Sequence, residues 1–209
     1  KNPKHNTGWT PLHAAAKYGN TDICETIIDY LEDKNPWDNN GWTPLHRAAK
    51  DGHLKVVQYI ADSLENKNPV DNNGRTPLHY AAINDHLNIF ESIIDINGNI
   101  STLLTTKFTN SEIPTPMGYA VIHNSLKVCK FIVENDLDQI LGDNTSGGQT
   151  FLHTAALFGH IELYKMILEK VADKIPLHCG YTPLHFAAGQ GHLEMCRLIL
   201  ENENDKNPV

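Results

Sequence analysis

The stretch that decides the fold is Asp38-Asn-Asn-Gly-Trp-Thr-Pro-Leu-His-Arg-Ala-Ala-Lys-Asp-Gly-His-Leu54, which recurs as Asp71-Asn-Asn-Gly-Arg-Thr-Pro-Leu-His-Tyr-Ala-Ala-Ile-Asn-Asp-His-Leu87. A match of this length within one chain indicates an internal repeat. Thr-Pro-Leu-His or a variant of it begins at Thr10, Thr43, Thr76, Thr115, Thr150 and Thr182, at successive spacings of 33, 33, 39, 35 and 32 residues. The sequence therefore predicts six repeats that together cover the chain.

The second repeat shows why each unit begins with a helix. The hydroxyl of Thr43 suits an N-cap, and Pro44 suits the first helical position because it has no N–H to leave unpaired. Ala48 and Ala49 are small enough for neighbouring helices to approach closely, and Gly52 supplies the flexible residue that ends the helix. A short helix is therefore predicted from Thr43 to Gly52.

The same repeat predicts a second helix followed by a hairpin-like loop. An apolar stripe at helical spacing follows His53 and consists of Leu54, Val56, Val57, Ile60, Ala61 and Leu64. Residues 67–74 then carry the Asn, Pro, Asp and Gly residues typical of turns. We expect Asp38 and Asp71, which head their loops, to accept local backbone hydrogen bonds rather than to act in catalysis.

The period and the Thr-Pro-Leu-His-x-Ala core resemble the ankyrin repeat over essentially the full length. The resemblance implies an all-α ankyrin-repeat solenoid of six stacked helix-turn-helix units with hairpin-like loops. We expect a single array over residues 1–209, because one helix pair cannot bury both of its faces alone. Its repeats would span residues 5–37, 38–70, 71–109 with an insertion, 110–144 in degenerate form, 145–176 and 177–209.

The pattern breaks in the third and fourth repeats. Residues 97–113 replace the usual loop, Gly118 stands where His is expected, and Asn124-Ser125 replaces Gly-His. Long insertions in repeat proteins often line a binding face, which would make this a specialised site. Drift in an internal repeat is an equal alternative, and the sequence leaves both open.

The composition excludes several classes of partner. A formal net charge of -8 leaves no excess of Lys and Arg to neutralise phosphates, so we expect no nucleic-acid partner and favour a basic or neutral one. No stretch is long and apolar enough to enter a membrane. Cys24, Cys129, Cys179 and Cys196 lack disulfide or metal spacing, which indicates reduced thiols, and we expect Cys24, Cys129 and Cys196 to pack in the core.

No catalytic or metal site is recognisable. Most of the twelve histidines occupy fixed repeat positions, namely His13, His46, His79, His153 and His185 in the motif and His53, His86, His160 and His192 after the turn. We interpret them as structural, since metal ligands must converge on one point. Hydrolase, metalloprotease, phosphate-loop and dinucleotide motifs are missing from the sequence. We therefore expect no metal, no cofactor and no enzymatic activity.

The resemblance implies a concave binding surface made by the loop tips and the first helices. The residues that vary there precede the Thr or end the first helix, and our candidates for contacting a partner are Trp9, Tyr18, Trp42, Asp51, Arg75, Ile83, Phe158 and Tyr181. Trp, Tyr and Arg are enriched among residues that dominate binding energy. Trp9 and Trp42 share one repeat position, so covering the neighbouring loop is an alternative role for both.

These expectations favour a non-catalytic scaffold that binds a protein or peptide, in the cytoplasm, as a monomer when isolated. The alternative is a regulatory or structural arm of a larger channel, enzyme or effector. It is motivated by the ends of the chain, since Lys1-Asn-Pro3 and Lys206-Asn-Pro-Val209 resemble the internal loops and not polar capping repeats. On that view, the segment belongs to a longer array.

Overall fold

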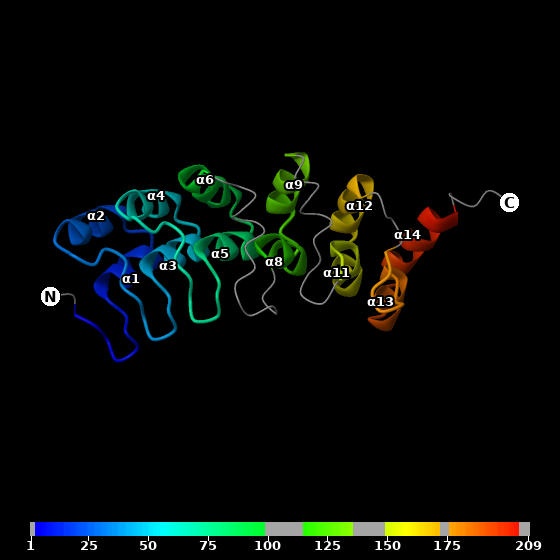
Figure 1. The fold of residues 1–209 in the computed structure, drawn as a ribbon, viewed down its shortest axis with the longest axis horizontal. Coiled ribbons are helices and arrows are strands. Elements are labelled where there is room, and N and C mark those ends of the chain that lie inside the picture. The colour runs from blue at the N-terminus through cyan, green and yellow to red at the C-terminus, as the bar shows by residue number, and fades with distance from the viewer. Residues whose placement is uncertain (1–2, 99–114, 136–148, 172–175, 205–209) are drawn as a thin grey trace. The chain divides into compact units, whose positions relative to one another are not determined.

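The computed structural model describes residues 3–98, 115–135, 149–171 and 176–204. Within these ranges the chain forms twelve α-helices and no β-strand, with one isolated antiparallel bridge between His178 and Tyr181. The helices occur in consecutive pairs (Figure 1). The predicted all-α architecture of helix pairs is confirmed.

Each pair has a short first helix and a second helix that follows after a tight turn. The first helices are α1 (Pro11–Lys17), α3 (Pro44–Asp51), α5 (Pro77–Ile83), α8 (Pro116–Ile122), α11 (Phe151–Phe158) and α13 (Pro183–Gly189). The second helices are α2 (Thr21–Asp29), α4 (Leu54–Asp62), α6 (Leu87–Asn97), α9 (Leu126–Glu134), α12 (Ile161–Lys170) and α14 (Leu193–Asn204).

The ends of α3 show how the motif encodes the helix. The side chain of Thr43 accepts a hydrogen bond from the backbone N–H of His46, and the backbone N–H of Thr43 donates to Nδ1 of His46 at 3.1 Å. This reciprocal capping box satisfies two backbone N–H groups that the first turn leaves unpaired. Gly52 ends the helix at φ +88°, in the left-handed region that favours glycine. The predicted start and end of this helix are confirmed.

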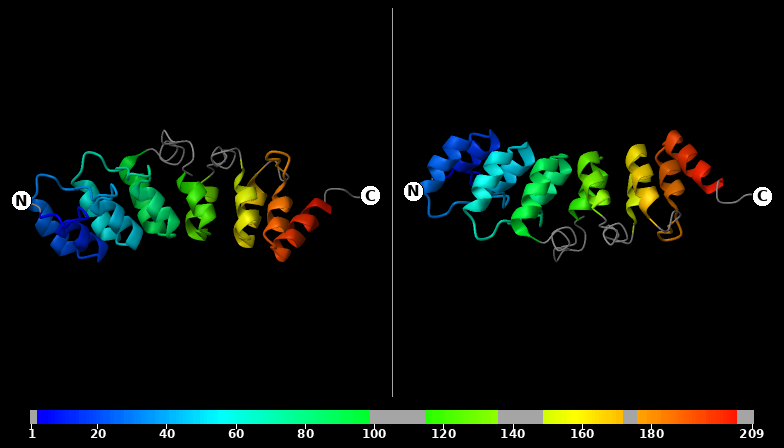
Figure 2. Two further views of the ribbon diagram at one scale, coloured as in Figure 1. Left: turned by 90° about the horizontal axis from the view of Figure 1, so that it is seen from below. Right: turned by 90° about the horizontal axis from the view of Figure 1, so that it is seen from above.

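The chain divides into two compact units, Lys1–Pro116 and Met117–Val209, which we call unit 1 and unit 2. In unit 1, α1, α3 and α5 pack side by side in one layer, while α2, α4 and α6 form a second layer (Figures 1 and 2). Unit 2 contains contacts between α11 and α13, between α11 and α12, and between α9 and α12. The prediction of one array with the six boundaries given above stays a prediction.

The core repeats along with the sequence. Leu12, Leu45 and Leu78 of the first helices in unit 1 are completely buried. Five of the second helices contribute a buried isoleucine at one equivalent position, and these residues are Ile60, Ile93, Ile132, Ile167 and Ile199. In α2 the residue at that position is half-buried, and the next residue, Ile28, is buried. Because the alanines at the middle of the first helices are buried as well, adjacent first helices come close enough to share these apolar side chains.

The degenerate fourth repeat still folds as a helix pair. Asn124 adopts φ +57°, the same region as Gly52, so the turn between α8 and α9 keeps the geometry of the regular repeats. The backbone N–H of Ser125 donates to the carbonyl oxygen of Ala120 at 2.8 Å, as that of His53 does to Ala48 at 3.0 Å. Asn tolerates the left-handed region better than most residues, which explains why glycine can be lost here. Of the insertion at residues 97–113, proposed as a specialised site, residues 99–113 lie outside the described residues.

The four cysteines are free thiols. Cys24 and Cys129 are fully buried, as expected for small apolar core residues, and burial raises the pKa of Cys24 to about 11. Cys196 is only half-buried and Cys179 is exposed. The core assignment therefore holds for Cys24 and Cys129 and only in part for Cys196.

Candidate protein-binding surface

The loops that precede α3 and α5 are hairpins, each clamped by a buried carboxylate. In the second repeat, Oδ1 of Asp38 accepts hydrogen bonds from the backbone N–H groups of Asn40 and Trp42 at 2.8 and 2.9 Å. Asp71 accepts the equivalent bonds from Asn73 and Arg75 at the same distances. The predicted turn role of both aspartates is confirmed.

The second oxygen of each aspartate accepts a hydrogen bond from the first helix that follows the hairpin. Oδ2 of Asp38 accepts from the guanidinium of Arg47 at 2.9 Å, and Oδ2 of Asp71 accepts from the hydroxyl of Tyr80 at 2.6 Å. Burial by itself raises the pKa of Asp38, but the N–H donors of Trp42 and Asn40 and the Arg47 guanidinium hold it below its ordinary value. Asp38 is thus kept ionised as an acceptor within the hairpin.

Adjacent hairpin tips are bonded to one another in register. The backbone N–H of Asn39 donates to the carbonyl of Thr7 at 3.0 Å, and that of Asn72 donates to the carbonyl of Asn40 at 3.1 Å. The side-chain amides of Asn39 and Asn72 add bonds to the carbonyls of Asn6 and Asn39. These bonds hold the hairpins of unit 1 as one continuous row.

Three of the motif histidines, His13, His46 and His153, connect one repeat to the next. Nδ1 of His46 accepts the backbone N–H of Thr43, so the pattern of bonds assigns the ring proton to Nε2, which donates to the carbonyl of Arg75 at 3.0 Å. Nε2 of His13 reaches the carbonyl of Trp42 at 2.9 Å in the same way. Burial lowers the pKa of His46 to about 4, and it also lowers that of His13. Both rings are therefore neutral at pH 7.

The histidines that follow the turn connect their repeat to the repeat before it. Nε2 of His53 lies 2.8 Å from the carbonyl of Lys17, and Nε2 of His86 lies 3.0 Å from that of Lys50. Each ring therefore donates to a carbonyl at the end of the first helix in the preceding repeat. That carbonyl has no hydrogen-bond partner within its own helix. The same bond recurs in unit 2 from His160 and His192. The structural interpretation of these histidines is confirmed.

This scaffold presents a row of cations and aromatic rings on the hairpins and first helices of unit 1. The guanidinium carbon of Arg47 lies 4.9 Å from the ring centre of Trp9 and 4.0 Å from that of Trp42. Arg47 thus bridges rings that come from two successive repeats. We call the whole row the cation–aromatic strip, and it consists of Trp9, Lys17, Tyr18, Trp42, Arg47, Lys50, Arg75 and Tyr80.

The strip continues in both directions from Arg47. The ammonium of Lys17 lies 5.8 Å from the Trp9 ring centre and 5.1 Å from that of Tyr18, while the ammonium of Lys50 lies 5.6 Å from that of Trp42. The rings of Trp42 and Tyr80 are 4.3 Å apart, and the Arg75 guanidinium lies 5.2 Å from Tyr80. All these distances fall within the range of cation–π and aromatic contacts.

The structure brings four of the eight predicted contact residues into this strip. Trp9, Trp42 and Arg75 are half-buried within it, and Tyr18 lies at its end with 67% of its surface exposed. Covering the hairpin is therefore part of the role of both tryptophans, since Arg47 joins their rings to Asp38. Of the two other candidates in unit 1, Asp51 is exposed at the end of α3 and Ile83 is half-buried at the end of α5.

The other two candidates lie in unit 2. Phe158 ends α11, is 44% exposed and stacks on His160 with ring centres 5.8 Å apart. Tyr181 is 55% exposed and contacts His185 and Phe186 edge to face. Each is available on the surface, but the first helices α8, α11 and α13 carry no charged residue, so no cation accompanies them there.

Four members of the strip were missed as contact candidates from the sequence. Lys17 and Lys50 are near the ends of the first helices, and Arg47 and Tyr80 occupy the variable position between the motif His and the first Ala. That position holds Ala14, Arg47, Tyr80, Tyr119, Thr154 and Phe186 in the six repeats. Its variability within an otherwise constant motif was the signal that could have found Arg47 and Tyr80.

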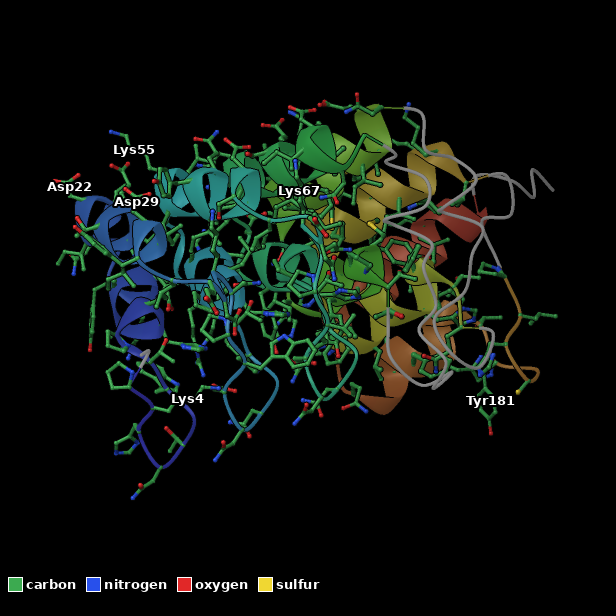
Figure 3. All side chains as sticks on the ribbon, turned by 60° about the vertical axis from the view of Figure 1, so that its left-hand side comes forward. Lys4, Asp22, Asp29, Lys55, Lys67 and Tyr181 are labelled. Atoms are coloured by element: carbon green, nitrogen blue, oxygen red, sulfur yellow. The ribbon has the colours of Figure 1, made fainter. Side chains whose placement is uncertain are left out.

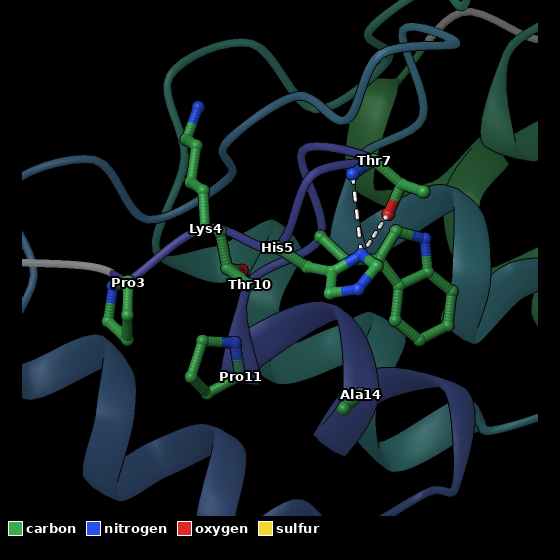
Figure 4. Close-up of a pocket in the computed structure, with 8 residues that line it drawn as sticks. Pro3, Lys4, His5, Thr7, Thr10, Pro11 and Ala14 are labelled. Atoms are coloured by element: carbon green, nitrogen blue, oxygen red, sulfur yellow. Dashed lines mark hydrogen bonds between the residues drawn. The ribbon is translucent and has the colours of Figure 1, made fainter.

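A pocket lies next to the first hairpin. Its lining includes Trp9, Pro11 and His5, and Nδ1 of His5 lies 3.0 Å from the hydroxyl and 3.3 Å from the backbone nitrogen of Thr7 (Figure 4). The lining contains no carboxylate or thiol. Elsewhere in the described ranges, no group of His, Cys, Asp or Glu has the geometry of a metal site, and no helix there is both long and apolar enough to span a bilayer.

A family model described as ankyrin repeats in three copies matches residues 1–70, 32–103, 64–143, 97–176 and 119–209. The chain belongs to the ankyrin-repeat family. Ankyrin repeats are generally modules of protein–protein interaction with a generally non-catalytic fold. No curated protein sequence matches the chain significantly.

Solved structures share this fold at low sequence identity. The human ASB11 ankyrin repeat domain superposes with a TM-score of 0.77 at 22% identity, covering 92% of this chain and 83% of that one. A chain of the complex between the predatory endopeptidase Bd0816 of Bdellovibrio bacteriovorus and the immunity protein Bd3460 gives 0.74 at 22% identity, covering 95% and 99%. At this identity the likeness establishes the ankyrin fold alone.

Proposed function

We propose that this chain is a non-catalytic scaffold that binds a protein or peptide on the concave face formed by the hairpin tips and the first helices. The observation that carries the proposal is the contrast between a constant framework and variable surface residues. The hydrogen bonds of His13, His46, Asp38 and Asp71 recur from repeat to repeat. The residues that they hold at the surface, such as Trp42 and Arg75, change.

The chemistry of this face suits recognition of another chain. Half-buried Trp and Arg side chains lose little rotamer freedom on binding, because the framework already holds them in place. The candidates for direct contact are Trp9, Tyr18, Trp42, Asp51, Arg75 and Ile83 in unit 1 and Phe158 and Tyr181 in unit 2.

Photo-crosslinking from two exposed tyrosines tests which face binds. Tyr18 follows α1 and is 67% exposed, whereas Tyr30 follows α2 and is 86% exposed. Each is replaced in turn by p-benzoylphenylalanine, and the chain is irradiated in an extract of cells that express it. We expect position 18 to capture a discrete protein, and the capture to be lost when Trp42 and Arg75 are replaced by Ala.

Position 30 is the matched control, since its exposure is at least as high. Equal capture of the same protein from position 30, or capture at position 18 that survives Trp42→Ala together with Arg75→Ala, would place the interface elsewhere. Circular dichroism of each variant checks that the helix pairs remain folded.

A further inference from the structure

Charge in unit 1 is segregated between the two layers of helices. The second helices α2, α4 and α6 carry six carboxylates against a single Lys55, and these are Asp22, Glu25, Asp29, Asp62, Glu91 and Asp95. The first helices α1, α3 and α5 carry Lys17, Arg47 and Lys50 against a single Asp51. In Figure 3, Asp22, Asp29 and Lys55 lie along the second helices, and Lys4 lies toward the hairpins.

The remaining carboxylates near the strip are already used within the fold. Asp38 and Asp71 are buried, accept backbone N–H groups of their own hairpins, and pair with Arg47 and Arg75. In the part of the chain that the structure describes, the ammonium groups of Lys17 and Lys50 have no carboxylate within ion-pair distance. Two cations are therefore held over aromatic rings without a counter-charge.

This arrangement favours a carboxylate from outside the chain. The tryptophan and tyrosine rings exclude water from one side of each ammonium, which strengthens its attraction to an anion that approaches from the other side. A basic segment would meet the two unpaired like charges of Lys17 and Lys50. The net charge of -8, which pointed to a basic or neutral partner, is a sum over the whole chain and does not describe this face, since the carboxylates on the helices of unit 1 are concentrated on α2, α4 and α6.

We propose that the cation–aromatic strip of unit 1 binds an acidic polypeptide segment, with Asp or Glu carboxylates seated against Lys17 and Lys50 and with aromatic or apolar side chains against Trp9 and Trp42. The proposal rests on the proposed function and specifies the chemistry of the partner. Arg47 and Arg75 position the rings, because their own charges are balanced by Asp38 and Asp71.

The direct probe is a copolymer of glutamate and tyrosine, titrated into the intact chain by isothermal calorimetry. We expect it to bind, and to bind more weakly as salt is raised, because partly exposed ion pairs are screened. Copolymers with Gln or Lys in place of Glu should bind at least tenfold more weakly. Equal binding of the Gln copolymer, or no binding of the Glu copolymer, would overturn the proposal.

Two charge-matched variants locate the site. Lys17→Gln with Lys50→Gln removes the unpaired cations of the strip, and Lys55→Gln with Lys67→Gln removes the same charge elsewhere (Figure 3). We expect the first pair to weaken binding about fivefold to tenfold, as two partly exposed ion pairs would, and the second pair to have little effect. Equal losses in both variants would mean a general electrostatic attraction and would contradict the proposal.

Duplex DNA serves as a second polyanion. Binding of DNA as tight as that of the Glu copolymer would contradict a site selective for acidic polypeptides. Capture at position 18 that persists in Lys17→Gln with Lys50→Gln would refute the acidic partner while leaving the proposed function intact. If the chain with p-benzoylphenylalanine at position 18 and no other substitution captures no protein, the proposed function itself is refuted.

Discussion

At the scale of single residues, the hairpins depend on backbone conformations that few side chains tolerate. Gly41 has φ +75°, and a Cβ built there lies 2.6 Å from the backbone nitrogen of Asn72 and 2.5 Å from its Oδ1. The next hairpin thus packs directly on this glycine. Conformation and contact both require glycine at this position.

We predict that Gly41→Ala destabilises the protein by about 2 kcal/mol, because it combines a strained φ with a clash against backbone. Urea denaturation followed by far-UV circular dichroism measures the effect. Gly189→Ala is the control, since its Cβ meets nothing within 4 Å and the residue lies in α13. If both variants unfold at the same urea concentration as the parent chain, the packing argument is wrong.

The hairpin of the last repeat is one residue shorter, and its turn requires a positive φ at two successive residues. His178 and Tyr181 exchange two backbone hydrogen bonds of 2.9 Å around Cys179 at φ +50° and Gly180 at φ +81°. Two central residues with positive φ define a type I′ turn, in which Asn-Gly is the preferred pair. The shorter hairpin also accounts for the spacing of 32 residues in place of 33.

Cys179→Asn should therefore stabilise the protein by about 0.5 kcal/mol, because Asn tolerates positive φ better than Cys does. Cys179→Val should destabilise it, since a β-branched residue is strained there. Thermal unfolding of the three proteins under reducing conditions gives the order. A Val variant as stable as the Asn variant would contradict this assignment of the turn.

At the scale of elements, the motif histidines act both inside a helix and between helices. His46 caps α3 through Nδ1 and donates to the next hairpin through Nε2, and its side chain is completely buried. His185 caps α13 with the same local geometry, but it is exposed and Nε2 has no partner among the described residues. Comparing the two separates the local role from the connection between repeats.

We predict that His46→Ala costs about 3 kcal/mol and His185→Ala about 1 kcal/mol. The first loses a cap, a buried hydrogen bond and packing, whereas the second loses the cap and an exposed edge-to-face contact with Tyr181. Chemical denaturation of both variants measures the difference. Equal costs would show that the contact between His46 and Arg75 adds nothing to stability.

At the scale of the whole molecule, stability accumulates from helix pairs that bury each other's faces. Among the described residues, each buried Leu or Ile has a buried apolar counterpart in an adjacent repeat. His13 and His46, two buried histidines whose pKa is lowered by burial, lie one repeat apart. Protonation of either ring therefore destabilises the folded state relative to the unfolded chain.

Stability should fall as the pH drops from about 6.5 toward 4. Burial lowers the pKa of folded His46 from 6.5 to about 4, so in this window the unfolded chain binds the proton and the folded chain does not. The shift corresponds to about 3 kcal/mol that is present in full above pH 6.5. His13 adds to the effect in the same direction.

Asp38 adds a second loss at lower pH. Its folded pKa is lowered, so its contribution is present above the unfolded value of 3.8 and disappears as the pH falls through the folded value. Urea midpoints measured between pH 4 and pH 7.5 test the histidine part. In His46→Gln the slope over this range should become shallower, and an unchanged slope would assign the pH dependence to other groups.

The sequence by itself determined the helix pairs, their capping by Thr and His, the turn aspartates and the ankyrin family, because each of these rests on short-range bonds within one repeat. It also predicted the structural role of the histidines, although not their partners. The spacing between repeats indicated which helices stack on one another, but it could not predict which side chains the variable residues contact.

Only the tertiary structure decided which of those residues meet. Arg47 lies between Trp9 and Trp42 because stacking brings side chains from adjacent repeats within 5 Å, a relation that no pattern within one repeat encodes. The unpaired Lys17 and Lys50 became visible for the same reason, since pairing depends on where every carboxylate lies in space. The net charge gives only the total over the chain. The fold of unit 1 decides which face carries the positive side chains and which face carries the negative ones.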